Sequence, residues 1–142
     1  MKFSDGFFDD GPGSEEIQLP PKSALFLAAL TVVAADGVIE NAEIADLDKI
    51  VRGDLTNFSL AHKTFKSNSY EKCVDLVAGS LNEKQKVALI AILLDLVMTD
   101  GILANAEEKL VSVYVSKFGI TADVFKDLCH YIAMKNNLSL FD

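Results

Sequence analysis

Apolar residues follow two different helical patterns along the chain. Nearly every residue is apolar from 22 to 35 and again from 87 to 99, which is typical of a helix packed on most of its sides. Residues 44–51 and 110–114 instead place apolar side chains three and four positions apart, the spacing that lines one face of a helix. The sequence therefore predicts two central helices, each followed by an amphipathic helix at the surface.

Three more helices complete the predicted fold. Residues 60–65 and 70–81 have a short and a medium helical pattern, separated by a polar break at 67–69. Residues 121–134 form the last predicted helix, with Thr121 as its N-cap. No run of alternating apolar and polar residues is long enough to predict a strand. We therefore expect an all-α fold, a single-domain bundle of about seven helices.

Two polar signals mark helix boundaries within this pattern. Asn82 is followed three residues later by Gln85, which is the spacing of a capping box at the start of the second central helix. Gly119 is expected to end the helix before Thr121, because glycine readily adopts the left-handed conformation that closes a helix.

An acid-glycine turn occurs twice, after each of the two central helices. Asp36-Gly37 and Asp100-Gly101 lie 64 positions apart. The surrounding residues match as well, which predicts an internal duplication of a helix-turn-helix unit. The identical pairs are Leu30 and Leu94, Val33 and Val97, Asn41 and Asn105, Ala42 and Ala106, and Glu43 and Glu107.

Each turn has the second half of an EF-hand calcium loop, in which an acid precedes glycine and a glutamate ends the loop. The acids are Asp36 and Glu43 in the first copy, and Asp100 and Glu107 in the second. Because calcium takes six to eight oxygen ligands, neither turn can enclose it alone. If the central helices end side by side, the four acids can form one divalent-cation site for calcium, magnesium, manganese or zinc, and Asp95 can join them.

A purely structural interpretation of these turns remains open. Gly37 and Gly101 can end the central helices, while Asp36 and Asp100 accept hydrogen bonds within the turn. The glutamates then interact with the positive end of the next helix. Asp95 needs its own explanation, because a charged acid in so apolar a helix costs several kcal/mol unless it has a partner, faces the rim of the bundle, or binds a ligand.

Composition narrows the functional classes. The formal charge of −8 disfavours nucleic acid and suits cations or basic partner proteins. The longest apolar run, 87–98, is interrupted by Asp95 and is shorter than the roughly 20 residues of a bilayer span, so we expect no membrane insertion and a cytoplasmic protein. Cys73 and Cys129 lack metal-ligand spacing and are expected to be reduced thiols.

The chain divides into an N-terminal arm, 1–21, and a helical domain, 22–142. The arm contains glycine and proline at 11–13 and two prolines at 20–21, with acids placed between Phe3, Phe7 and Phe8. We expect a flexible acidic-aromatic arm, either a disordered tail or a segment that docks onto a groove of its own or a neighbouring domain.

Catalytic chemistry finds little support in the sequence. His62 and His130 lack metal-ligand spacing, and there is no nucleophile motif, dinucleotide fingerprint or P-loop, so we expect neither enzyme activity nor an organic cofactor. The aromatic residues near the end of the chain, Phe118, Phe125 and Tyr131, are interpreted as core residues.

Two apolar helices, each followed by Asp-Gly, an apolar residue and a Glu seven positions after the Asp, resemble the TerB-like family of bacterial tellurite-resistance proteins. A related domain accompanies a membrane-anchored J-domain co-chaperone. The resemblance covers about 22–137 and implies an all-helical fold, a cytoplasmic role in the stress response, and a metal-binding acidic patch. Residue by residue, that patch corresponds to Asp36, Glu43, Asp95, Asp100 and Glu107.

We therefore expect a stress-response module that binds a divalent cation at this acidic patch, a partner protein, or both. The alternative is a metal-free protein–protein interaction scaffold. A carboxylate-based hydrolase is a third class, since clustered acids can support general acid-base or two-metal chemistry. The sequence leaves the oligomeric state open.

Overall fold

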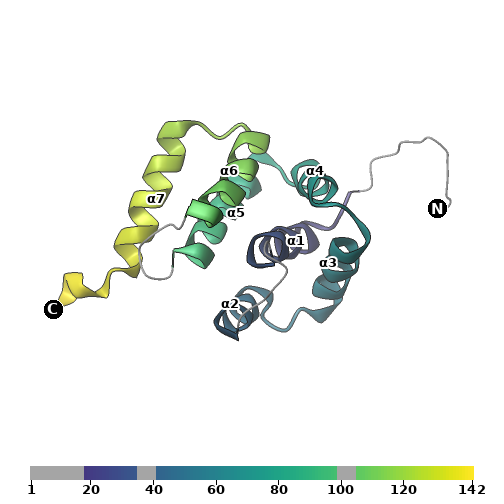
Figure 1. The fold of residues 1–142 in the computed structure, drawn as a ribbon, viewed down its shortest axis with the longest axis horizontal. Coiled ribbons are helices and arrows are strands. Elements are labelled where there is room, and N and C mark those ends of the chain that lie inside the picture. The colour runs from purple at the N-terminus through teal and green to yellow at the C-terminus, as the bar shows by residue number, and fades with distance from the viewer. Residues whose placement is uncertain (1–17, 35–40, 99–104) are drawn as a thin grey trace.

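The structure is a computed structural model of the 142-residue chain and describes residues 18–34, 41–98 and 105–142, without the side chains of 41–43 and 105–107. Within these ranges there are seven α-helices, one short 3₁₀-helix and no strand (Figure 1). This confirms the expected all-α bundle. The elements are α1 Pro21–Val33, α2 Asn41–Val51, α3 Leu55–Ser67, α4 Tyr70–Ser80, α5 Glu83–Val97, α6 Asn105–Phe118, α7 Ala122–Asn136 and η2 Leu138–Phe141.

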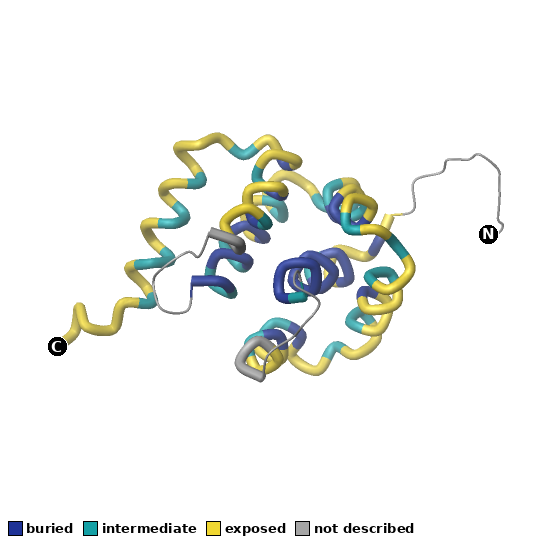
Figure 2. The backbone as a smooth tube through the Cα atoms, in the orientation of Figure 1, coloured by how far each residue is buried: buried dark blue, intermediate teal, exposed yellow. Residues whose placement is uncertain are grey.

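Helix α1 is the centre of the fold, as its apolar sequence predicts. It packs against α2, α3 and α4 on one side and against α5 and α6 on the other, and it is the most completely buried helix in Figure 2. Its two buried polar side chains both have hydrogen-bond partners. Ser23 donates to Asn57 Oδ1 at 2.7 Å, and Thr31 donates to the Ala28 carbonyl at 2.7 Å.

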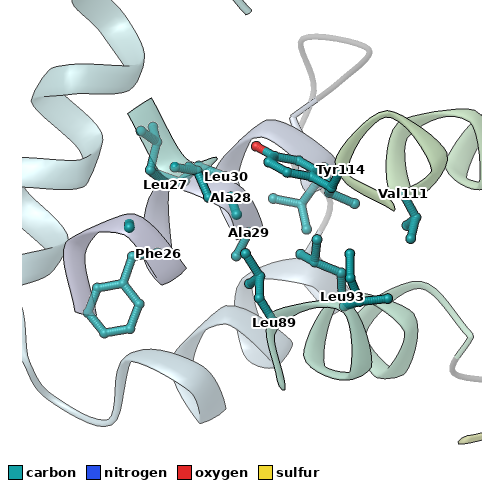
Figure 3. Close-up of a cluster of buried hydrophobic side chains, with 14 of the residues drawn as sticks. Phe26, Leu27, Ala28, Ala29, Leu30, Leu89, Leu93, Val111 and Tyr114 are labelled. Carbon is teal, nitrogen blue, oxygen red and sulfur yellow. The ribbon is translucent and has the colours of Figure 1, made fainter. Parts of the chain in front are cut away.

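One cluster of buried apolar side chains forms the core, with α1 between α3 and α4 on one side and α5 and α6 on the other. Figure 3 draws part of this core, with Leu27 and Leu30 of α1, Leu89 and Leu93 of α5 and Tyr114 of α6, and all five side chains are buried. The Tyr114 hydroxyl lies 2.7 Å from Thr31 Oγ1. Because Thr31 uses its only hydroxyl proton for Ala28, Tyr114 is the donor in this pair.

Two helices begin earlier than their apolar patterns predict, because polar caps set their first turns. Helix α5 begins at Glu83 rather than 87, since Asn82 and Gln85 form the predicted capping box with bonds of 2.8 and 2.9 Å. Helix α3 begins at Leu55 rather than 60, since the Asp54 carboxylate accepts a bond of 3.2 Å from the Asn57 backbone and one of 2.8 Å from its side chain. These bonds also lower the pKa of Asp54.

Helix α7 is capped by Thr121 as predicted, and Gly119 has the expected left-handed φ of 71°. Of the three aromatic residues assigned to the core, Phe118 is buried and Phe125 is partly buried, but the assignment of Tyr131 was wrong because its side chain is 64% exposed. Helix α7 covers α5 with one face only, and Tyr131 lies on the opposite face.

The remaining features concern the membrane, the cysteines and the start of the domain. Among the described residues, no helix combines the length and apolar character that crossing a bilayer requires. Cys73 and Cys129 are free thiols, and burial raises the pKa of both. Before α1, Leu19 is buried and its backbone N–H donates to Ser80 Oγ at 2.9 Å, so the packed domain begins before residue 22.

Candidate functional site

The four acids of the two turns fall largely outside the described structure. Asp36 and Asp100 lie outside the described residues, and Glu43 and Glu107 lie in the first turns of α2 and α6, where side chains are not described. Whether these carboxylates share one site therefore stays a prediction. Among the described residues, no group of three or more His, Cys, Asp or Glu side chains is arranged to hold a metal ion.

The helix boundaries next to the turns repeat with the same offset as the sequence. Helices α1 and α5 end at Val33 and Val97, and α2 and α6 begin at Asn41 and Asn105, so both pairs are 64 residues apart. The last turns of α1 and α5 also close alike. Ala34 donates to the Leu30 carbonyl at 3.0 Å and Met98 to the Leu94 carbonyl at 2.8 Å. Helices α1 and α5 therefore end in the same way, and α2 and α6 begin at equivalent positions.

Asp95, the one candidate ligand whose side chain is described, lies in a hydrogen-bonded ion pair. Lys135 Nζ lies 2.8 Å from Asp95 Oδ1, and Asn136 Nδ2 donates to the same oxygen at 3.1 Å. Asn136 Nδ2 also donates to the Met98 carbonyl at 3.1 Å. These contacts join the end of α7 to the end of α5, so Asp95 is not an isolated charge in an apolar helix.

The pKa of Asp95 reflects this environment. Partial burial on its own raises the pKa of this carboxyl, but the hydrogen bonds from Lys135 and Asn136 and the positive charges of Lys135 and Lys49 outweigh burial and lower it. Asp95 is therefore ionised at neutral pH, and its described hydrogen-bond partners are a lysine and an amide rather than acids. This arrangement favours a structural role for Asp95 over the role of a metal ligand.

Asp95 lies in a groove of about 640 Å³ between α1, α2, α5 and α7, which we name the cationic groove. Its charged residues are Lys22, Lys49, Arg52, Lys135, Asp46 and Asp95, a formal excess of two positive charges in a chain of −8. The sequence alone did not indicate this groove, because its four cations come from three helices and a turn that are distant along the chain.

A second surface that sequence reasoning missed is an apolar face at the C-terminal end of the chain. It consists of exposed apolar side chains on the outside of α7 and in η2, which we name the C-terminal apolar face. Phe141 is 86% exposed and Leu138 is 73% exposed. The spacing of seven and three residues from Val124 to Tyr131 and Met134 of α7 is the signal that could have indicated it. Its residues are Val124, Tyr131, Met134, Leu138, Leu140 and Phe141.

The two histidines contact aromatic rings, and His130 borders the C-terminal apolar face. His62 stacks on Phe58 with ring centroids 6.2 Å apart, and the His130 ring meets the edge of Tyr131 at 5.5 Å.

The fold of the described residues places the chain in the class of small all-α proteins. The family model described as "Tellurite resistance protein TerB" matches residues 22–130, which is well over half of the chain, and the chain therefore belongs to the TerB family. The resemblance seen in the sequence is thus confirmed.

One similar solved structure supports the same fold. It is the crystal structure of a protein of unknown function from Porphyromonas gingivalis W83, with a TM-score of 0.56, 21% sequence identity, and coverage of 82% of this chain and 97% of that chain. At this identity the similarity shows a shared fold alone. No match to a curated protein was found.

Proposed function

We propose that this TerB-family protein is a cytoplasmic stress-response module that acts by binding a partner protein through its C-terminal apolar face. The observation that carries the proposal is the exposure of Tyr131, Met134, Leu138 and Phe141, which lie within eleven residues at the end of the chain. Soluble monomers seldom expose several large apolar side chains together unless the surface is used for binding. The proposed role is binding, and it requires no enzyme activity.

The form of the face indicates the kind of partner. Val124, Tyr131 and Met134 follow one another at intervals of seven and three residues, the spacing of one face of α7, and Leu138 follows in η2 after the helix has ended at Asn136. Such a face fits the apolar face of an amphipathic helix, in which the anchor side chains recur at the same intervals. We therefore expect the partner to contribute a helix.

The test is a quantitative comparison of binding surfaces. The full chain is used to capture partners from native cell extract, the captured protein is identified and purified, and its affinity is measured by calorimetry. Replacing Tyr131 and Leu138 together by serine should weaken binding by at least about tenfold, because a central anchor contributes about 2 kcal/mol or more. Lys126→Ser, also exposed on α7, is the matched control and should leave affinity unchanged.

Two results would contradict this proposal. One is a partner whose affinity is the same for the wild type and the double serine variant. The other is a homodimer, detected by light scattering, that the double variant converts to a monomer, since this would assign the apolar face to a second copy of the chain.

We further propose that the two turns bind one divalent cation through Asp36, Glu43, Asp100 and Glu107, with Asp95 outside the ligand set. The support is the repeated register of the helix ends at both turns, together with the Lys135 and Asn136 contacts that already occupy Asp95. The carboxylate set suits calcium, magnesium, manganese or zinc, with water and backbone carbonyls completing the coordination.

Metal content and thermal stability test this second role. We expect stoichiometric metal in the purified protein, and a stabilisation of about 2.7 kcal/mol when the ion is at 100 times its Kd. Asp36→Asn and Asp100→Asn should each abolish the thermal shift, whereas Asp95→Asn should retain it. If none of the four ions shifts the melting temperature of the metal-free protein, the cation role is excluded.

A further inference from the structure

The acidic start of the chain and the cationic groove have opposite charge. Residues 1–17 contain one lysine and five carboxylates, so they hold −4 of the formal charge of −8. The cationic groove has a formal charge of +2, from four cations and two carboxylates. The rest of the chain, 18–142, is itself negative at −4, with 12 Lys and Arg against 16 Asp and Glu. The groove is therefore a local exception on an acidic domain.

An apolar pocket of about 180 Å³ adjoins this groove between α1 and α5. Lys22, Leu25 and Ile92 line both, and Leu81 and Ala88 help to line the pocket alone. A cavity of roughly 150 Å³ is large enough to bind benzene, so the pocket can hold one phenyl ring. The combined surface therefore suits a segment that carries an aromatic residue next to acids.

The chain enters the domain at the rim of this surface. Gln18 Nε2 donates to the Gly79 carbonyl at 3.3 Å, and the Leu19 backbone is bonded to Ser80, immediately before Leu81 of the pocket. Pro21 lines the pocket as well. The first 17 residues are therefore attached directly beside the pocket.

We propose that residues 1–17 bind in cis to the surface formed by the apolar pocket and the cationic groove. Phe7 or Phe8 fills the pocket, and Asp9 and Asp10 face the four cations of the groove. The seven residues 11–17 can span up to about 25 Å, which is enough to reach both parts of the surface. This inference is independent of the two proposed binding roles.

Because residues 1–17 are covalently attached to the domain, even a weak contact between them and the domain is formed in most molecules. A short flexible connection gives an effective concentration of about 1 mM, so a contact with a Kd of about 0.3 mM is three-quarters formed. Because exposed charge pairs are screened by salt, the bound fraction should fall as ionic strength rises.

The absence of tryptophan from the chain allows a specific reporter. In Phe8→Trp the only tryptophan is in the acidic segment, and its fluorescence reports the environment of that position alone. We expect a blue-shifted emission, and acrylamide quenching about fourfold weaker than in the urea-unfolded chain if three-quarters of the molecules are docked. The signal should not depend on protein concentration, because the contact is within one chain.

Charge reversal in the Phe8→Trp background tests the site itself. Lys22→Glu with Lys49→Glu should return the quenching of the introduced tryptophan to nearly its value in the unfolded chain, as should Asp9→Lys with Asp10→Lys. Combining all four changes should restore protection. The matched control is Lys63→Glu with Lys126→Glu, two exposed lysines outside the groove, which makes the same change in net charge. Circular dichroism melting establishes that each variant is folded.

The proposal is overturned if the introduced tryptophan is as accessible in the native chain as in urea, or if the groove pair and the control pair of lysine reversals have the same effect. A blue shift that disappears on dilution would also overturn it, because the acidic segment would then bind a second copy of the chain.

Discussion

The buried contact between Thr31 and Tyr114 allows the packing of α1 on α6 to be tested as a coupling energy. Both side chains are almost completely buried, and burial raises the pKa of Tyr114 far above its usual value, so the hydroxyl stays protonated. Thr31→Val leaves the Tyr114 hydroxyl without its acceptor, which should lower the free energy of unfolding by about 1–3 kcal/mol. Tyr114→Phe leaves Thr31 bonded to the Ala28 carbonyl and should cost only about 0.5–1.5 kcal/mol.

The double variant is the informative one. With both hydroxyls removed, no buried donor lacks an acceptor, and the combined change should approach neutrality. We therefore expect the double variant to be more stable than the sum of the single effects predicts, by about 1.5–4.5 kcal/mol. The assay is urea unfolding followed by far-ultraviolet circular dichroism, with the slope of unfolding free energy against urea checked for constancy.

A second threonine provides the control for this cycle. Thr64 on α3 donates to the Leu60 carbonyl at 2.7 Å, as Thr31 does to Ala28, but it has no hydroxyl partner among the described residues. Thr64→Val and Tyr114→Phe should be additive within about 0.5 kcal/mol. Additivity of Thr31→Val and Tyr114→Phe as well would refute the assigned hydrogen bond.

Three further predictions concern the ion pair and the core. Because the pKa of Asp95 is lowered in the folded chain, its carboxylate stabilises the fold above the ordinary value of 3.8, and that stabilisation is lost as pH falls through the folded pKa. Asp95→Asn should therefore lower the free energy of unfolding by less than about 1 kcal/mol at pH 7, since solvent screens the pair with Lys135. A difference in stability between the wild type and this variant that grows on acidification would contradict this. Tyr70→Phe should raise stability by up to about 1 kcal/mol, because the Tyr70 hydroxyl is buried without a partner among the described residues; a loss of stability in urea unfolding would show that it is bonded. Leu93→Ala should cost about 2–5 kcal/mol by the same assay, because this fully buried side chain leaves a cavity.

The fold was largely predictable because its signals are local in sequence. The apolar run of α1 indicates burial on all sides, and the cap at Thr121 and the capping box at Asn82 mark helix starts through groups no more than three residues apart. The early start of α3 was missed because its cap, Asp54, precedes a segment with a weak apolar pattern. A polar cap can add a turn of helix that hydrophobic periodicity does not reveal.

The surfaces were harder to predict because they depend on contacts between distant segments. The sequence indicates that Asp95 needs a partner but not which one, because Lys135 and Asn136 lie 40 and 41 residues later on another helix. The exposure of Tyr131 depends on which face of α7 meets α5, and both faces of α7 carry apolar residues. Pattern reasoning finds amphipathic helices, but it does not choose between two apolar faces.

Asn136 connects the end of α5, which precedes the second acid-glycine turn, with the end of α7, which precedes the C-terminal apolar face. Its side-chain amide donates both to Asp95 and to the carbonyl of Met98, the last described residue before the second acid-glycine turn. Asn136 is also the last residue of α7, two positions before Leu138 of the C-terminal apolar face. A ligand that repositions the end of α5 therefore changes the hydrogen bonds that hold the end of α7. Coupling of this kind requires a part of the protein that has two arrangements, with both binding sites affecting the balance between them. The end of α7 suits that role, because α7 has no fully buried residue. It is held by one half-buried face and by these polar contacts.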